Sequence, residues 1–315
     1  MRLRGERDLL SAPALVVPAR QRGSALVLAG AVLWGTAGAA QELLDGAVTP
    51  VTVGAMRSVL GGLVLFIVAV PSLRGAVARW RAALGTLVLA GGCIAAYQVA
   101  FFVGVRSLGI AVGTILAIGT APFVAGAVSI LTGRHRPSRY WTLTTLLAIV
   151  GLILLVRPDG DVRVSLGGAL AAVGAGAAFG VFTVLSKDLL GRGLRRLDTV
   201  VLPFLVGGAL LLPVLIHGVL TSDRAGQLVE LPGLAVVAWL AVGATAAGYL
   251  LFIAGLGSVA AVAGTTLVLA EPLTAGLLGV IVFGERLGPV ATVGAATVAL
   301  ALVLAARRPE VEVAR

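Results

Sequence analysis

Hydrophobic runs separated by short polar links follow one another along nearly the whole chain. A helix needs about 20 apolar residues to cross the ~30 Å hydrocarbon core of a bilayer, and the runs are close to that length. We expect ten membrane spans in two sets of five, at residues 25–43, 51–70, 83–103, 108–131 and 141–156, then 166–185, 200–220, 234–254, 259–283 and 289–306. Five is an odd number, so the second set enters the membrane from the opposite side. The predicted fold class is an all-α polytopic membrane protein, with ten transmembrane helices as two inverted five-helix repeats.

The same pattern divides the chain into tails, repeats and a linker. We expect a cytoplasmic N-terminal tail at 1–22, a first repeat at 23–156, an outer linker at 157–165, a second repeat at 166–306 and a cytoplasmic C-terminal tail at 307–315. The weakly apolar start of the chain is not expected to be a cleaved leader, because prolines and arginines interrupt it. The shortest links, near Arg106-Ser107 and at 255–257, occupy the same place in each half.

Composition excludes an ordinary soluble protein. Apolar residues make up 59% of the chain, charged residues only 12%, and the mean hydropathy is +1.07. A soluble fold of this size typically has about 25% charged residues to cover its surface. The missing water-facing surface must therefore face lipid, which makes the bilayer itself a predicted partner.

Charge placement predicts the orientation. Most of the 24 basic residues fall in the tails and in the links on the same side as the tails, whereas Arg57 lies inside a span. The opposite links hold only Arg106, Arg157, Arg163, Arg224 and Arg286. Basic residues resist translocation, so both termini are expected in the cytoplasm. The net charge of +10 is explained by this bias, and nucleic acid is not an expected partner.

One proline-containing pattern occurs twice, about 150 residues apart. Residues 111–126 and 261–276 both begin with Ala-Val, carry a central proline (Pro122 and Pro272) and end with Ala-Gly. The second copy places Glu271 directly before its proline, near the middle of a span. A carboxylate there costs several kcal/mol, so it should face the bundle interior. A duplicated, proline-broken helix with a central carboxylate is typical of solute transport.

Two readings of this pattern stay open. Glu271 either contacts a substrate amine or carries a proton, or it is a structural carboxyl bonded to a neighbouring helix. Each proline lacks an N–H, so the carbonyls of Ile118 and Val268 are expected to lose their usual helical donor. Pro122 and Pro272 are accordingly predicted helix-kink residues, either hinges at a cavity or fixed bends.

Further polar residues inside the spans are candidates for lining a cavity. Arg57 lies about 10 Å deep at 1.5 Å per residue, where it either binds a substrate anion, snorkels outward or pairs with Glu42 or Asp45. The others lie within spans rather than in the interfacial belts where such aromatic residues concentrate. For these, interhelical packing is the alternative. They are Trp34, Tyr97, Gln98 and Tyr249.

The chain lacks the usual motifs of enzymes and metalloproteins. It has no Gly-x-x-x-x-Gly-Lys loop for nucleotide phosphates. Two histidines and the single Cys93 cannot form an ordinary zinc site. We therefore expect no catalytic residues, no metal and no cofactor, and we do not expect an enzyme.

The ordered set of short motifs resembles the drug/metabolite transporter superfamily, specifically EamA-type permeases. The resemblance covers residues 23–306, and its motifs lie in both halves of the chain. They are Trp34-Gly35-Thr36, Arg57, Tyr97, Pro122, Tyr249, Leu269-Ala270-Glu271-Pro272 and Phe283-Gly284-Glu285-Arg286-Leu287. The first half departs from the second, with Ala121-Pro122 where the second has Glu271-Pro272. Any carboxylate-dependent step is therefore expected in the second half.

The resemblance implies secondary transport of a small metabolite, such as an amino acid, through a central cavity by alternating access. Export is the expected direction, and the expected location is the plasma (inner) membrane of a bacterium, since arginine replaces lysine at all basic positions except Lys187. Coupling to protons is one hypothesis. The alternatives are an uncoupled facilitator, a non-transporting scaffold or receptor, and an intramembrane enzyme.

Overall fold

Helices account for the regular structure of the described residues. The computed structural model describes residues 19–72, 74–156 and 165–310, so most of the predicted tails at 1–22 and 307–315 and of the predicted linker at 157–165 lies outside it. The first five spans are α1 (Ala19–Glu42), α2 (Pro50–Ala69), α4 (Leu84–Leu108), α5 (Ile110–Leu131) and α6 (Arg139–Leu155). The second five are α7 (Leu166–Gly191), α8 (Arg196–Leu220), α9–η3–α10 (Leu231–Ala238, Trp239–Ala247, Gly248–Leu256), α11–α12 (Ala261–Leu267, Ala270–Phe283) and α13 (Pro289–Arg307).

The ten-helix prediction is confirmed, although α6 is shorter than the rest. Within the described residues nine helical spans are long and apolar enough to cross a bilayer, and α6 adds an apolar helix of 17 residues. Three short helices occupy links: η1 (Val70–Ser72), α3 (Ala76–Ala82) and η2 (Ala225–Val229). Our pattern did not predict α3, because its seven residues are too few to show a periodicity.

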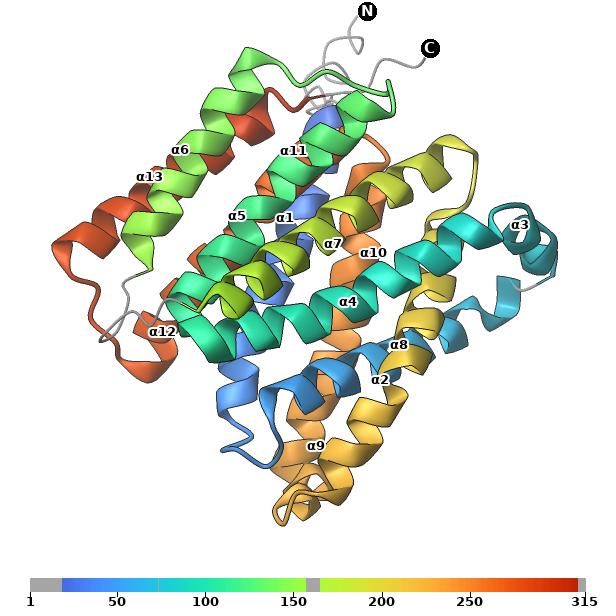
Figure 1. The fold of residues 1–315 in the computed structure, drawn as a ribbon, viewed down its shortest axis with the longest axis vertical. Coiled ribbons are helices and arrows are strands. Elements are labelled where there is room, and N and C mark those ends of the chain that lie inside the picture. Colours follow the sequence, from blue (N-terminus) through green and yellow to red (C-terminus); the bar gives the residue numbers. More distant parts are fainter. Residues whose placement is uncertain (1–18, 73, 157–164, 311–315) are drawn as a thin grey trace, which may run out of the picture.

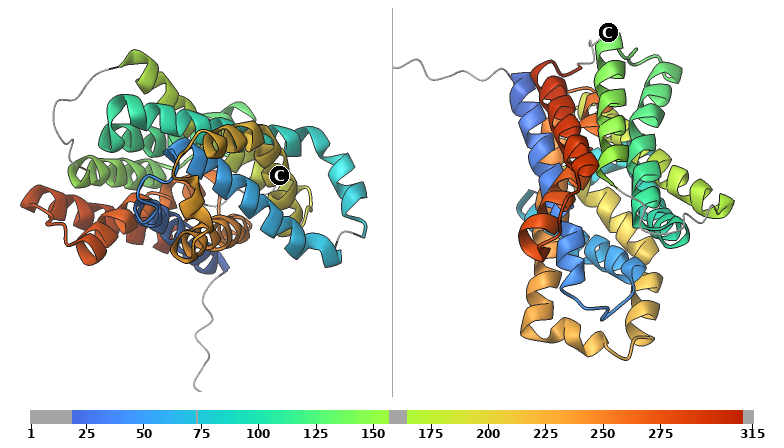
Figure 2. Two further views of the ribbon diagram at one scale, coloured as in Figure 1. Left: turned by 90° about the horizontal axis from the view of Figure 1, so that it is seen from below. Right: turned by 90° about the vertical axis from the view of Figure 1, so that its left-hand side faces the viewer.

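Packing between the helices repeats in both halves. α1 packs on α10 as α4 packs on α7, and α1 packs on α12 as α5 packs on α7. The pairs α2·α8 and α6·α13 each join equivalent spans of the two repeats and lie at opposite edges of the bundle (Figure 1). In the right-hand view of Figure 2, α6 and α13 face the viewer. The start of α1 and the end of α13 border a shared cleft, so both lie at one end of the bundle, which we call the termini end.

One predicted link is wrong by a few residues. We expected the turn between the third and fourth spans near Arg106-Ser107, but α4 continues to Leu108 and the turn is the single residue Gly109. Gly109 has a φ of 84°, a conformation that glycine adopts without the steric cost of a Cβ atom. The chain therefore reverses where its backbone is free to do so.

Small residues let the two repeats approach closely. Gly176 and Gly180 of α7 face the backbone of α5, where an added Cβ at Gly180 would lie 2.7 Å from the Ala121 carbonyl oxygen. No hydrophobic effect drives helices together in lipid, so close backbone contact is a main source of association. Gly174, on the same helix, has no atom within 4 Å of its added Cβ.

Replacing Gly180 by valine is therefore expected to destabilise the protein, whereas Gly174→Val is not. Both substitutions change helix propensity equally, so the difference isolates packing. Overpacking typically costs about 1–3 kcal/mol, and here the opposing atoms are backbone that cannot rotate away. Thermal unfolding of the purified protein in detergent should show a lower Tm for Gly180→Val only. Equal Tm values for the two variants would contradict this contact.

Candidate functional site

A narrow cavity lies between the two repeats. Its volume is about 30 Å³, and since one water needs roughly 10–15 Å³ on this scale, it holds a few waters and no metabolite. The walls come from α1, α2, α4 and α5 of the first repeat and from α7, α10, α11 and α12 of the second. The lining residues are Trp34, Arg57, Tyr97, Ala117, Ile118, Ala121, Phe179, Tyr249, Thr265, Val268 and Glu271.

Five of the six predicted substrate-binding residues line this cavity. They are Trp34, Arg57, Tyr97, Tyr249 and Glu271. Gln98 does not: it is buried, and its amide donates to the Gly54 carbonyl at 2.8 Å and to the Ser58 hydroxyl at 3.1 Å. Gln98 therefore joins α4 to α2, which was the packing alternative for this residue.

The ninth span is broken directly before Glu271. α11 ends at Leu267 and α12 begins at Ala270. We expected the Val268 carbonyl to lack a donor because Pro272 has no N–H. Instead the chain tightens, and the Glu271 backbone N–H donates to the Val268 oxygen at 2.8 Å. In the equivalent span, α5 is continuous through Pro122, so the helix is interrupted near Pro272 but not at Pro122.

The Glu271 side chain is a partly exposed carboxylate at the cavity wall. Within the described residues the Glu271 carboxylate has no hydrogen bond to another side chain or to the backbone, and no basic side chain lies within ion-pair distance of it. A structural carboxyl bonded to a neighbouring helix, the alternative we kept open, is therefore not what this conformation shows. The carboxylate is left available to whatever enters the cavity.

Arg57 crosses from α2 to an unusual helical turn. Its Nε donates to the Thr245 hydroxyl at 3.2 Å, and its Nη2 lies 3.5 Å from the Ala244 carbonyl oxygen. These acceptors belong to η3, a π-helical stretch of nine residues, where the wider turn lets Thr245 donate to the Leu240 carbonyl at 2.7 Å. Of the open alternatives for Arg57, pairing with Asp45 is not seen, because Asp45 pairs with Arg224 at 2.6 Å. Such π-helical turns are frequent at functional sites.

Aromatic rings form the rest of the wall. The Trp34 ring lies 4.6 Å from that of Tyr249 and 5.8 Å from that of Phe179, and Tyr97 lies 5.7 Å from Phe179. The Trp34 indole N–H is buried and finds no acceptor in the described part of the chain. Among the described residues, neither the Tyr97 nor the Tyr249 hydroxyl has a hydrogen-bond partner. The cavity therefore combines apolar ring faces with donors that the fold leaves unused.

Comparisons with known proteins show the family to which the chain belongs. The model of the EamA-like transporter family matches the chain twice, at residues 21–157 and 166–307. The chain belongs to this family. It is similar to the Bacillus subtilis (strain 168) protein named uncharacterized transporter YwfM, with 38% identity over 259 residues that cover 81% of this chain and 83% of that protein. A crystal structure of a protein with 20% identity shares the fold, with a TM-score of 0.75 over 90% of this chain and 96% of that one.

The match to the EamA-like family confirms the resemblance predicted from the short motifs. The protein is a multi-pass membrane transporter. Twofold matching of one family model agrees with the repeated helix packing, since each match covers five spans. Neither the family nor the fold specifies a cargo, so the cargo class has to be inferred from the side chains that line the cavity.

The two repeats of this EamA-like protein contribute unequal chemistry to the cavity. Tyr97 and Tyr249 come from equivalent spans, as do Trp34 and Phe179, so the aromatic walls follow the repeat. The charges do not. Glu271 occupies the place that Ala121 holds in the first repeat, and both residues line the cavity. The cavity thus has one carboxylate and one guanidinium, the asymmetry that the sequence motifs indicated.

Sequence reasoning did not single out Thr245. No signal in the sequence marks a π-helical turn, so the partner of Arg57 could not be found. Thr265 lines the cavity, and Thr266 accepts from the indole N–H of Trp141 at 3.0 Å, which holds α11 against α6. The described residues contain no cluster of three or more metal-binding side chains.

Proposed function

We propose that this protein is a bacterial plasma-membrane permease that moves a small metabolite by alternating access. The supporting observation is the cavity between the repeats, where Glu271 and Arg57 present opposite charges among aromatic rings. A scaffold or receptor needs no such polar cavity, and its two charges are costly inside a membrane unless they serve a purpose. The cavity is too small for cargo in this conformation, so the repeats must separate to admit it.

The chemistry of the walls favours a zwitterionic cargo, such as an amino acid or a related compound. Glu271 suits a cationic amine, and Arg57 suits a carboxylate, which its planar fork can bind through two hydrogen bonds. Aromatic faces such as those of Trp34, Tyr97 and Tyr249 accommodate an apolar body or an ammonium group. The distribution of basic residues supports cytoplasmic termini, and export is the proposed direction.

The function is tested by profiling metabolites in the medium of cells that express this chain. The comparison strain expresses Glu271→Gln at the same level in the membrane. We expect a zwitterionic metabolite to accumulate outside only with the parent chain. Equal profiles for the two strains, together with no difference in uptake of labelled amino acids, would contradict the proposal. An imposed pH gradient then separates the two mechanisms: it drives flux in a proton-coupled transporter and leaves an uncoupled facilitator unaffected.

A further inference from the structure

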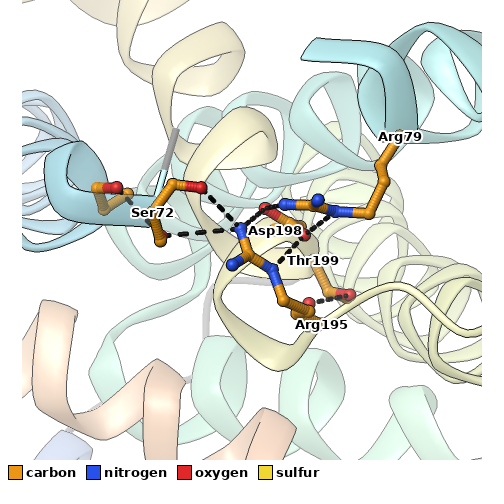
Figure 3. Close-up of polar contacts among 6 residues, drawn as sticks. Ser72, Arg79, Arg195, Asp198 and Thr199 are labelled. Carbon is orange, nitrogen blue, oxygen red and sulfur yellow. Dashed lines mark hydrogen bonds and ion pairs between the residues drawn. The ribbon is translucent and has the colours of Figure 1, made fainter. Parts of the chain in front are cut away.

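A cluster of charges around the buried carboxylate of Asp198 joins the two repeats at the termini end of the bundle. Asp198, near the start of α8, has a side chain only 3% exposed. Arg79 of α3 donates to it from Nε at 2.7 Å, and Arg195 donates through both Nε and Nη2, at 2.9 Å and 3.0 Å. Arg195 also donates to the Ser72 carbonyl at 3.0 Å, so the cluster reaches back to the end of the second span (Figure 3).

Two further contacts cross between the repeats at this end. Arg134 pairs with Asp188 at 2.7 Å. The Glu310 carboxylate accepts from the Ser138 backbone N–H and hydroxyl at 2.9 Å and 2.8 Å, and its other partner, His135, lies 3.1 Å away. In the Arg79–Asp198 and Arg134–Asp188 pairs the first repeat supplies the arginine and the second repeat supplies the carboxylate. In the third contact the carboxylate belongs to Glu310, which follows the second repeat. Opposite charges at this end therefore hold one repeat against the other.

The far end of the bundle is held much more weakly. Among the described residues its ion pairs are limited to Asp45–Arg224, which joins the α1–α2 link to the α8–α9 link at 2.6 Å. The Asp45 carboxylate is 87% exposed and Arg224 is 48% exposed, whereas the Asp198 carboxylate is only 3% exposed, with Arg79 and Arg195 at 31% and 43%. Exposed pairs contribute little, whereas breaking a buried pair leaves an uncompensated charge in a poorly solvated place. Two inverted repeats with identical side chains would give the two ends of the bundle the same contacts. The difference in ion pairs between the ends therefore comes from side chains that differ between the repeats.

We infer that Asp198, Arg79 and Arg195 form a charge clamp that keeps the cavity closed toward the termini end, so that the far end opens more readily. The cavity can then open at the termini end only when the contacts of Asp198 with Arg79 and Arg195 break. Such a change is expected of a protein that switches between two packed states. This inference extends the alternating-access mechanism proposed above. It concerns which side can reach the cavity, and its test needs no cargo.

The test measures access to a cysteine in the cavity from each side of the membrane. Cys93→Ser removes the only native thiol, and Thr265→Cys then places a single thiol of similar size in the cavity wall. A charged methanethiosulfonate reagent that cannot cross membranes is added to right-side-out and to inside-out vesicles. Labelling rates from the two sides report how often each end opens.

In this background, Asp198→Asn is expected to raise the labelling rate from the termini end at least about tenfold, the change that 1.4 kcal/mol gives. Labelling from the far end should fall, because the same molecules spend less time open to that side. Asp45→Asn, the matched substitution at the exposed pair, should change either rate less than about twofold.

Two more variants keep the result interpretable. Arg79→Gln leaves the Arg195–Asp198 pair intact, so it should fold even where Asp198→Asn does not, and it should raise labelling from the termini end. Arg79→Lys keeps the charge and should fall between Arg79→Gln and the parent. Folded Arg79→Gln and Asp198→Asn proteins that are labelled from the termini end at the parent rate would overturn the clamp. Transport of a metabolite is not measured, so a wrong cargo cannot produce this outcome.

Discussion

Glu271→Gln is expected to reduce export of the identified metabolite about tenfold to a hundredfold while leaving the protein folded. Glutamine keeps the size of the side chain and removes its charge. A hydrogen bond to a charged group contributes about 1.5–3 kcal/mol, and each 1.4 kcal/mol is tenfold. Because this carboxylate has no hydrogen-bond or ion-pair partner among the residues that the structure describes, its loss breaks no contact seen there. The measurement is the initial efflux rate at matched membrane expression.

Glu285→Gln is the matched control for that variant. Glu285 lies in the second of the two family motifs of the ninth span, but it is exposed at the far end and does not line the cavity between the repeats. Its substitution should leave the efflux rate within about twofold of the parent, as is usual for surface changes. Efflux by Glu271→Gln at the parent rate would mean that the carboxylate does not bind the cargo. A Glu271→Gln protein that still moves cargo and still responds to a pH gradient would remove Glu271 as the proton carrier.

Most of the fold was predictable because the bilayer restricts what a chain can do. Backbone groups in lipid must be bonded within a helix, so spans follow from apolar length alone. Five spans per half required an inverted repeat, and the doubled match to the family agrees with it. The duplicated proline pattern correctly marked the ninth span as special, since α11 and α12 meet directly before Pro272. It did not predict that α5 stays continuous at Pro122.

The site was predictable only in part, because side-chain direction depends on contacts between distant helices. Charged and aromatic residues in mid-span were correctly expected to share a cavity, since lipid is a costly alternative for Glu271 and Arg57. Gln98 looked equally suitable, yet it faces α2, one helix position away from the cavity-lining Tyr97. Thr245 and the wide turn that carries it depend on how α2 packs on η3. No local pattern in the sequence reports that contact.

Arg57→Gln is expected to reduce efflux of a zwitterionic cargo by a similar factor, about tenfold to a hundredfold, because it removes a charged, two-pronged donor. Arg57→Lys should recover little, since a lysine cannot reproduce the fork that reaches both Thr245 and a carboxylate. The initial efflux rate is compared with that of Arg224→Gln, which removes an exposed arginine and should stay within about twofold of the parent. Parent-rate efflux by folded Arg57→Gln would show that the cargo's anion binds elsewhere.

Thr245 gives this prediction a second, independent readout. Thr245→Val keeps the shape of the side chain and removes the hydroxyl that accepts from Arg57, so the guanidinium loses its fixed position. We expect efflux to fall several-fold with Thr245→Val and to stay near the parent rate with Thr245→Ser. Cargo analogues then show which charge of the cavity binds which end of the cargo. Efflux of an analogue without its carboxylate should be unaffected by Arg57→Gln and Thr245→Val but should fall with Glu271→Gln. An analogue without its amine should show the reverse, because each charge of the cavity binds only one end of the cargo.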